Sequence, residues 1–204
     1  GFDPLAVGMD YEEVSRRSAN GSFREVMSLF PMVREEALAQ MAALEEHAAG
    51  ADVIVGSSVF AVGSILAERF GKPYVFFVFC PQMIPSGDHP SPPVKWHSLP
   101  RWLNRLSWAW FEWLTARLLR STLNRLRADR RLARVERIWP SLLGNWPVLA
   151  CEPALAAAPS DYPVPITQVG ALFLRDDGAF SPELSAFLDA REPPVYIGFG
   201  SMSA

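Results

Sequence analysis

The chain has 204 residues, half of them apolar, and a formal net charge of -3 at neutral pH. This near-neutral balance argues against a nucleic-acid binder, and no apolar run approaches the roughly 20 residues that a membrane-spanning helix needs. The two cysteines, Cys80 and Cys151, lie far apart without metal or redox spacing, so we expect reduced thiols in a cytoplasmic protein.

The first part of the chain predicts alternating helices and strands. Apolar residues at helical spacing predict a helix over 22–49, which Gly50 ends. Short apolar runs predict strands at 52–55 and 73–79, and the intervening residues 57–70 predict a helix. A strand, a helix and a strand in this order are typical of a parallel sheet with helices on both faces. We therefore expect an α/β fold that contains half of a doubly wound, Rossmann-like domain.

Ligands of such sheets bind beyond the carboxyl ends of the strands. In this sequence the rule points to Gly56, Ser57 and Ser58 after the first strand, and to residues 80–89 after the second. The second segment continues into a proline-rich loop that ends at Pro93. Taken alone, this composition favours a rigid connector over a ligand site.

Residues 96–137 are rich in tryptophan and arginine. Trp102, Leu106, Trp110, Trp113 and Leu114 recur at helical spacing, with Trp108 and Phe111 off that line, and such a stripe is usually core. Between Arg101 and Arg137 stand ten arginines and three acidic residues. A solvated face with salt bridges is the commonest role of such arginines. The alternatives are a hydrophobic pocket or lid, or a peripheral membrane surface with a basic face.

The last part of the chain predicts a short strand at 148–151, then a stretch with Pro153, Pro159, Pro163 and Pro165 that suits a semi-rigid linker. Ser181 and Pro182 predict a helix start, and Leu184, Phe187 and Leu188 its buried face. A final strand is expected at 195–199, followed by a small-residue loop.

That loop, Gly200-Ser201-Met202, fits the first half of a phosphate-binding turn. An ordinary tight turn is the commoner role of such residues. A dinucleotide fingerprint is disfavoured because Ser203 stands where its third glycine would fall.

Four segments, 51–57, 67–75, 169–172 and 181–202, occur in the order seen in nucleotide-sugar-dependent glycosyltransferases of the two-domain GT-B fold. The chain most resembles the sterol glucosyltransferase-like and antibiotic glycosyltransferase group. The resemblance implies an acceptor-binding domain over 1–150 without its first strand, an interdomain linker over 151–180, and the start of a donor-binding domain over 181–204. It also implies that the chain is an internal piece of a longer enzyme.

The resemblance assigns expected site residues. Acceptor contacts are expected at the ends of the first two strands and in the proline-rich loop, namely at Ser57, Ser58, Pro81, Gln82, Pro85 and His89. Donor contacts are expected at Gly200, Ser201 and Met202, where backbone N–H groups and the serine hydroxyl would approach the diphosphate.

The function implied is transfer of a hexosyl group from a UDP- or dTDP-sugar to a hydroxyl of a bulky apolar acceptor, with inversion. No catalytic base is assigned, because His47, His89 and His97 match no motif of the family, and no carboxylate or histidine cluster has metal-ligand spacing. The chain by itself is therefore expected to be inactive. The alternative is a non-catalytic domain that binds a lipophilic small molecule. A serine hydrolase is disfavoured, because neither Gly56-Ser57-Ser58 nor Gly200-Ser201-Met202 completes a nucleophile elbow.

Overall fold

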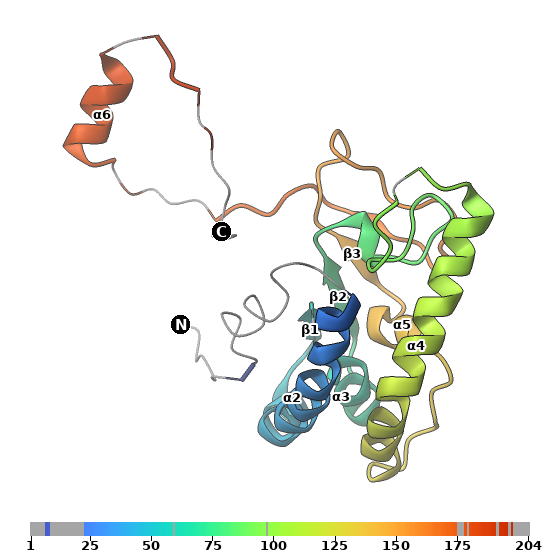
Figure 1. Cartoon of the computed structure of the whole chain (residues 1–204). Coiled ribbons are helices and arrows are strands. Elements are labelled where there is room, and N and C mark those ends of the chain that lie inside the picture. Colours follow the sequence, from blue (N-terminus) through green and yellow to red (C-terminus); the bar gives the residue numbers. More distant parts are fainter. Residues whose placement is uncertain are drawn as a thin grey trace. The chain divides into compact units, whose positions relative to one another are not determined.

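The computed structural model describes residues 7–8, 23–58, 60–96, 98–174, 178, 180–190, 192–195 and 197. The chain divides into two compact units, Gly1–Leu172 and Phe173–Ala204. The first unit contains the sheet and most of the helices (Figure 1).

A parallel sheet forms the centre of the first unit. Its strands are β1 (Ile54–Ser57), β2 (Tyr74–Val78), β3 (Pro147–Leu149) and β4 (Thr167–Gln168), in the spatial order β1-β2-β3-β4. All three pairings are parallel, with Ile54 opposite Tyr74 and Phe76 opposite Pro147. Parallel strands need crossover connections, which helices supply between the first three strands, whereas residues 150–166 join β3 to β4 without a helix. The predicted α/β, Rossmann-like fold is confirmed.

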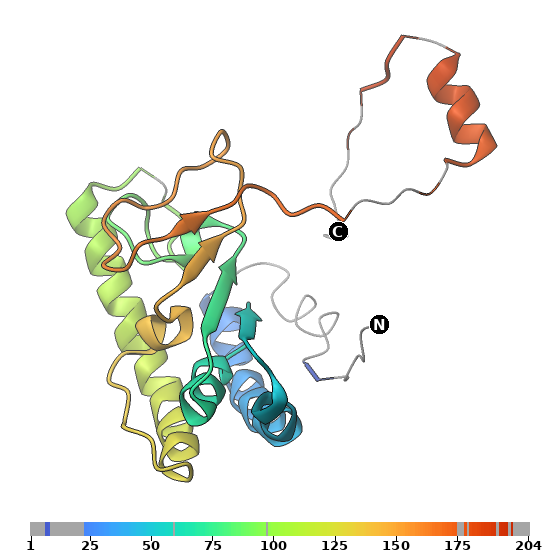
Figure 2. The ribbon, with the colours of Figure 1, turned by 180° about the vertical axis from the view of Figure 1, so that it is seen from behind.

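Helices flank this sheet and build the core. They are α2 (Phe23–Gly50), α3 (Gly63–Phe70), α4 (Arg101–Ala128) and α5 (Ile138–Leu143), with a 3₁₀ turn η1 at Pro81–Met83. Buried side chains of α2, α3 and α4 pack into one apolar cluster, and those of β2, β3 and α5 into a second. The two opposite views show α4 beside α5 (Figures 1 and 2).

The helix predicted over 57–70 starts six residues later than expected. Strand β1 continues through Ser57, and Ser58 adopts a left-handed backbone with φ of 52°. The chain then turns before α3 begins at Gly63, where a Cβ would lie 2.6 Å from the rings of Phe60 and Tyr74. The absence of a side chain at this position permits the close packing of the turn on β2. Apolar periodicity alone does not reveal such a turn.

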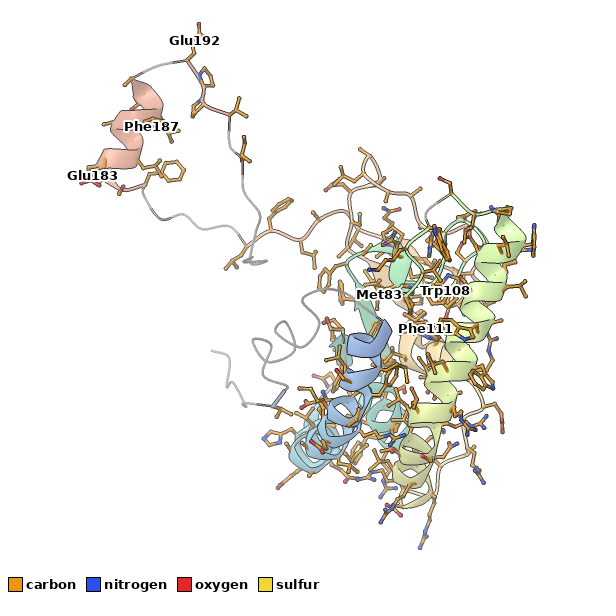
Figure 3. The ribbon with its side chains drawn as sticks, viewed as in Figure 1. Met83, Trp108, Phe111, Glu183, Phe187 and Glu192 are labelled. Carbon is orange, nitrogen blue, oxygen red and sulfur yellow. The ribbon has the colours of Figure 1, made fainter. Side chains whose placement is uncertain are left out.

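The apolar stripe predicted on α4 is confirmed at Leu114, which is buried, and is wrong at most of its other positions. Trp102, Leu106 and Trp113 are 61%, 57% and 59% exposed, whereas Trp108 and Phe111, which the prediction left off the stripe, are only 5% and 6% exposed. Figure 3 labels Trp108 and Phe111 on α4. They pack with Leu114 of α4 and Trp139 of α5. Aromatic residues occur around the whole helix, so helical spacing alone does not indicate which of its faces is buried.

Residues 151–172, the first part of the predicted linker, belong to the first compact unit. Gln168 in β4 donates from Nε2 to the carbonyls of Cys151 and Ala156, at 2.8 and 2.9 Å, and accepts from the Ala158 N–H. Tyr162 and Ile166 pack against the cluster of β2 and β3. Despite the prolines before it, the segment forms the two-residue strand β4 at the edge of the sheet. Edge strands tolerate nearby prolines because one side of the strand has no hydrogen-bonded neighbour.

The second unit contains α6 (Pro182–Asp189). Its predicted start is confirmed, because the Ser181 hydroxyl accepts a hydrogen bond from the Leu184 N–H at 3.2 Å. The prediction that Leu184 and Phe187 form a buried face is wrong within this unit, since these side chains are 43% and 57% exposed. The predicted strand at 195–199 lies mostly outside the described residues, and the expected donor residues Gly200, Ser201 and Met202 lie entirely outside them.

Candidate functional site

An apolar cavity of about 410 Å³ lies at the carboxyl end of β2. The strand itself supplies Phe76, Phe77 and Val78, and the residues just after it, Phe79 and Cys80, continue the wall. The opposite walls come from α2, the turn before α3, α4 and α5, which contribute Val33, Ser58, Ala61, Thr115, Leu119, Leu123, Ile138, Trp139, Ser141 and Leu142. The cavity therefore occupies the edge of the sheet where α/β proteins bind ligands.

The chemistry of this cavity suits a lipophilic ligand. None of the described residues that line it is a carboxylate, a histidine or a lysine or arginine. Its side-chain polar groups are hydroxyls, the Cys80 thiol and the indole N–H of Trp139, and the Thr115 hydroxyl already donates to the Phe111 carbonyl at 2.8 Å. Pockets lined in this way bind by apolar contact, with a few polar groups that fix orientation.

Of the predicted acceptor residues, Ser58 alone is among the described residues that line this cavity. Ser57 is the last residue of β1. Pro81 and Gln82 form the 3₁₀ turn that follows β2, where Pro81 is buried and Gln82 exposed, and their neighbour Met83 is the member of η1 that lines the cavity.

A second cavity, of about 400 Å³, receives Pro85 from the proline-rich loop. Its lining includes four charged groups, namely Arg105 and Glu112 from α4, Arg137 before α5 and Asp161 from the segment before β4. Tyr162 also lines it, and burial raises the pKa of this phenol, opposed by the Arg137 charge and assisted by that of Glu112. Trp139 contributes to both cavities.

His89 lines neither of these two cavities. Its ring lies edge-on to Trp108, with centroids 6.0 Å apart, and its Nδ1 is 3.2 Å from the Pro90 carbonyl oxygen. The buried Nε2 has no hydrogen-bond partner among the described residues. The His89 carbonyl in turn accepts from the Trp108 indole N–H at 3.2 Å, which ties the proline-rich loop to the core face of α4.

Asp161 joins the proline-rich loop to α4. Its carboxylate accepts from the Ser86 hydroxyl at 2.6 Å and the Gly87 N–H at 2.9 Å, and it pairs with Arg105 at 3.0 Å and Arg101 at 3.3 Å. Burial alone would raise the pKa of Asp161, but these hydrogen bonds and the Arg101 charge outweigh burial and lower it to about 2. The carboxylate is therefore ionised throughout the physiological range, and it holds the loop in place.

Sequence reasoning missed the residues that α4 and α5 contribute to the apolar cavity. Thr115, Leu119 and Leu123 recur every four residues along α4, which is a signal for one shared helix face. The sequence prediction followed the tryptophans instead, and these lie mostly on another face of the helix. Nothing in the sequence marks Ile138 and Trp139 as neighbours of β2.

The part of the chain that the structure describes contains neither a metal-binding cluster nor a membrane-spanning helix. There, no three His, Cys, Asp or Glu side chains come together in a way that would hold a metal ion. Likewise, no described helix combines the length and apolar character needed to cross a membrane.

No family model matches the sequence. Similarity to curated proteins is nevertheless clear. The chain is 36% identical over 155 residues to a vancomycin aglycone glucosyltransferase of Amycolatopsis orientalis. The matched region makes up 74% of this chain and 38% of the relative. A dTDP-epi-vancosaminyltransferase of the same organism is 31% identical over 159 residues, or 76% of the chain and 36% of the relative.

A third relative, an uncharacterized glycosyltransferase of Mycobacterium leprae, is 30% identical across 99% of the chain and 50% of its own length. The chain thus spans half or less of the length of these relatives. All three are named as glycosyltransferases, so the chain, with its Rossmann-like sheet, is similar in sequence to glycosyltransferases.

Proposed function

We propose that this chain is the acceptor-binding part of an inverting glycosyltransferase that moves a hexosyl group from a UDP- or dTDP-sugar to a hydroxyl of a bulky apolar acceptor. The observation that carries the proposal is the apolar cavity at the carboxyl end of β2, in a chain similar to glycosyltransferases. One relative is named for an aglycone acceptor and another for a dTDP-sugar, which supports these substrate classes.

The reaction defines what the cavity has to do. The acceptor oxygen forms a bond to the anomeric carbon, the bond from that carbon to the nucleotide diphosphate breaks, and a base takes the hydroxyl proton. Holding the acceptor in a fixed pose supplies much of the rate, because it turns a two-molecule encounter into a step within one complex. The apolar walls would bind the body of the acceptor and leave its hydroxyl at the open end of the sheet.

The base and most of the donor site are assigned to no described residue. Gly200, Ser201 and Met202 remain proposed donor contacts, with backbone N–H groups that would stabilise the leaving diphosphate. Ser57, Ser58, Pro81, Gln82, Pro85 and His89 remain the proposed acceptor contacts. We propose that the 204 residues alone bind acceptor without transferring sugar.

A second candidate is a binding domain for a lipophilic small molecule that catalyses nothing. The same cavity favours it, because its described lining offers apolar contact and no acid or base beyond the Cys80 thiol. Both candidates predict that the cavity binds an apolar acceptor. They differ in whether the longer protein also binds a nucleotide sugar and transfers the sugar.

The apolar cavity is tested with 2-naphthol, an apolar probe with a hydroxyl, by calorimetry on the chain and two matched variants. Leu119→Trp fills the cavity from α4, whereas Leu106→Trp makes the same substitution on the exposed face of the same helix. We expect binding to the unmodified chain and to Leu106→Trp, and at least tenfold weaker binding to Leu119→Trp. Equal binding by all three would place the probe elsewhere and contradict the proposal.

Transfer is tested by incubating 2-naphthol with UDP-glucose or dTDP-glucose. We expect no glucoside from the 204 residues and a glucoside from a longer chain that extends them along the gene in both directions. In that longer chain, Leu119→Trp should raise the KM for 2-naphthol and leave the KM for the sugar donor unchanged. A longer chain that binds 2-naphthol but no nucleotide sugar would favour the binding-domain candidate instead.

A further inference from the structure

Helix α4 exposes a face on which aromatic and apolar residues come first and arginines follow. Trp102, Leu106 and Trp113 lie on this face and are more than half exposed. Arg117 and Arg120 continue the same face toward the carboxyl end of the helix, and both are exposed. At 1.5 Å per residue, the face from residue 102 to residue 120 is about 27 Å long.

The exposure is not a consequence of missing packing on the other side of the helix. The opposite face is filled, because Trp108, Phe111 and Leu114 are all buried against α5. Exposed tryptophans at this density are uncommon on a surface that meets only water, since each buries a large apolar area when it finds a partner.

The charge of α4 is one-sided. Glu112 is its sole acidic residue, and its carboxylate is occupied by the backbone N–H groups of Ile138 and Trp139 on the inner side, at 2.6 and 3.1 Å. Of its arginines, Arg127 is buried against Glu68 and cannot reach a partner outside. Arg120 has only a loose contact, 3.7 Å, with an exposed Glu136. The outer face of α4 is therefore apolar and cationic, with no carboxylate of its own helix to compete.

We propose that this face of α4 docks on the surface of an anionic phospholipid membrane. Indole rings favour the boundary between headgroups and acyl chains, and guanidinium groups beside them bind the phosphates. A single exposed face of this kind suits a helix that lies in the plane of the membrane surface. The inference concerns the outside of the first unit and does not depend on sugar transfer, although it would bring the apolar cavity close to a source of lipophilic acceptors.

The test is flotation of the chain with vesicles of phosphatidylcholine alone and of phosphatidylcholine with phosphatidylglycerol, at low and high salt. We expect flotation with the anionic vesicles that weakens as salt rises, because screening removes the charge attraction. The double variants Trp102→Ser/Trp113→Ser and Arg117→Glu/Arg120→Glu should each lower the partition coefficient at least tenfold. Leu155→Ser and Arg134→Glu change exposed residues outside α4 and should float as the unmodified chain does.

Thermal unfolding of each variant, followed by circular dichroism, checks that the fold is kept. Three results would overturn the proposal. One is failure of the unmodified chain to float with anionic vesicles, and another is flotation that neither double variant reduces. The third is concentration-dependent self-association that Trp102→Ser/Trp113→Ser abolishes while flotation is unchanged, which would assign the face to a second copy of the chain.

Discussion

At the scale of single residues, Asp161 makes several strong interactions that the sequence alone does not predict. It comes from a proline-rich stretch, yet it accepts hydrogen bonds from Ser86 and Gly87, which lie 75 and 74 residues earlier in the chain. Arg101 and Arg105, one turn apart on α4, add charge to the same carboxylate. The proline-rich loop is held by this residue, so a change at Asp161 should affect both stability and loop position.

The lowered pKa of Asp161 sets the pH range in which it stabilises the fold. A carboxyl with a pKa of about 2 in the folded chain, against 3.8 as its reference, contributes fully above about pH 4 and loses that contribution as the pH falls toward 2. We expect Asp161→Asn to lower the free energy of unfolding by about 2 kcal/mol at pH 6 and by about half as much at pH 3. Urea titrations at both values of pH measure the difference.

The control for this experiment is Asp52→Asn, at an exposed aspartate outside the network. It reports what the loss of an aspartate does to the unfolding free energy by itself. If Asp161→Asn lowered the free energy of unfolding equally at pH 6 and pH 3, the side chain would stabilise the fold through its shape and not through its charge.

At the scale of elements, α4 has one buried and one exposed aromatic face. Trp108 stacks edge-on against Trp139, with ring centroids 5.6 Å apart, and is 5% exposed, whereas Trp113 on the same helix is 59% exposed. We expect Trp108→Ala to lower the free energy of unfolding by about 3–5 kcal/mol, because it leaves a large cavity beside α5. Trp113→Ala should change the free energy of unfolding by about 0.5 kcal/mol or less.

The pair is a matched test, since both variants remove the same side chain from the same helix. Chemical unfolding followed by circular dichroism measures the two values under identical conditions. Equal losses at the two positions would mean that both faces of α4 are buried in solution, and would also remove the basis for membrane docking.

At the scale of the whole molecule, residues 151–172 were predicted to be part of a linker, but they belong to the first compact unit. The predicted linker begins at 151, whereas the compact unit extends to Leu172 and includes β4. We expect a chain of residues 1–172 to unfold cooperatively, with a Tm within about 2 °C of that of the 204 residues, because the second unit is separately compact. A chain of residues 1–150 should lose more than about 5 °C, since it lacks Asp161, Tyr162 and β4.

Calorimetry of the three chains measures both the midpoints and the cooperativity. A chain of residues 1–150 that is as stable as the chain of residues 1–172 would show that the intervening segment serves as a linker after all.

The sequence by itself determined the fold class and the order of most of the elements. Apolar runs and helical spacing lie within short windows, so the helix that became α2, the strands β1 and β2 and the Ser181 cap were predicted to within a few residues. The carboxyl-end rule also directed attention to Ser58 and the residues after β2, where the apolar cavity lies. These features depend on local preference and on the general topology of parallel sheets.

Only the tertiary structure decided which face of α4 is buried, where α3 begins and which segment completes the sheet. A helix with tryptophans all round has no unique apolar face until a partner such as α5 packs on one of them. In the same way, the late start of α3 follows from the fit of Gly63 against Phe60 and Tyr74, and β4 follows from pairing with β3. Each of these depends on contacts between residues distant in the chain, whose energies no local window of sequence contains.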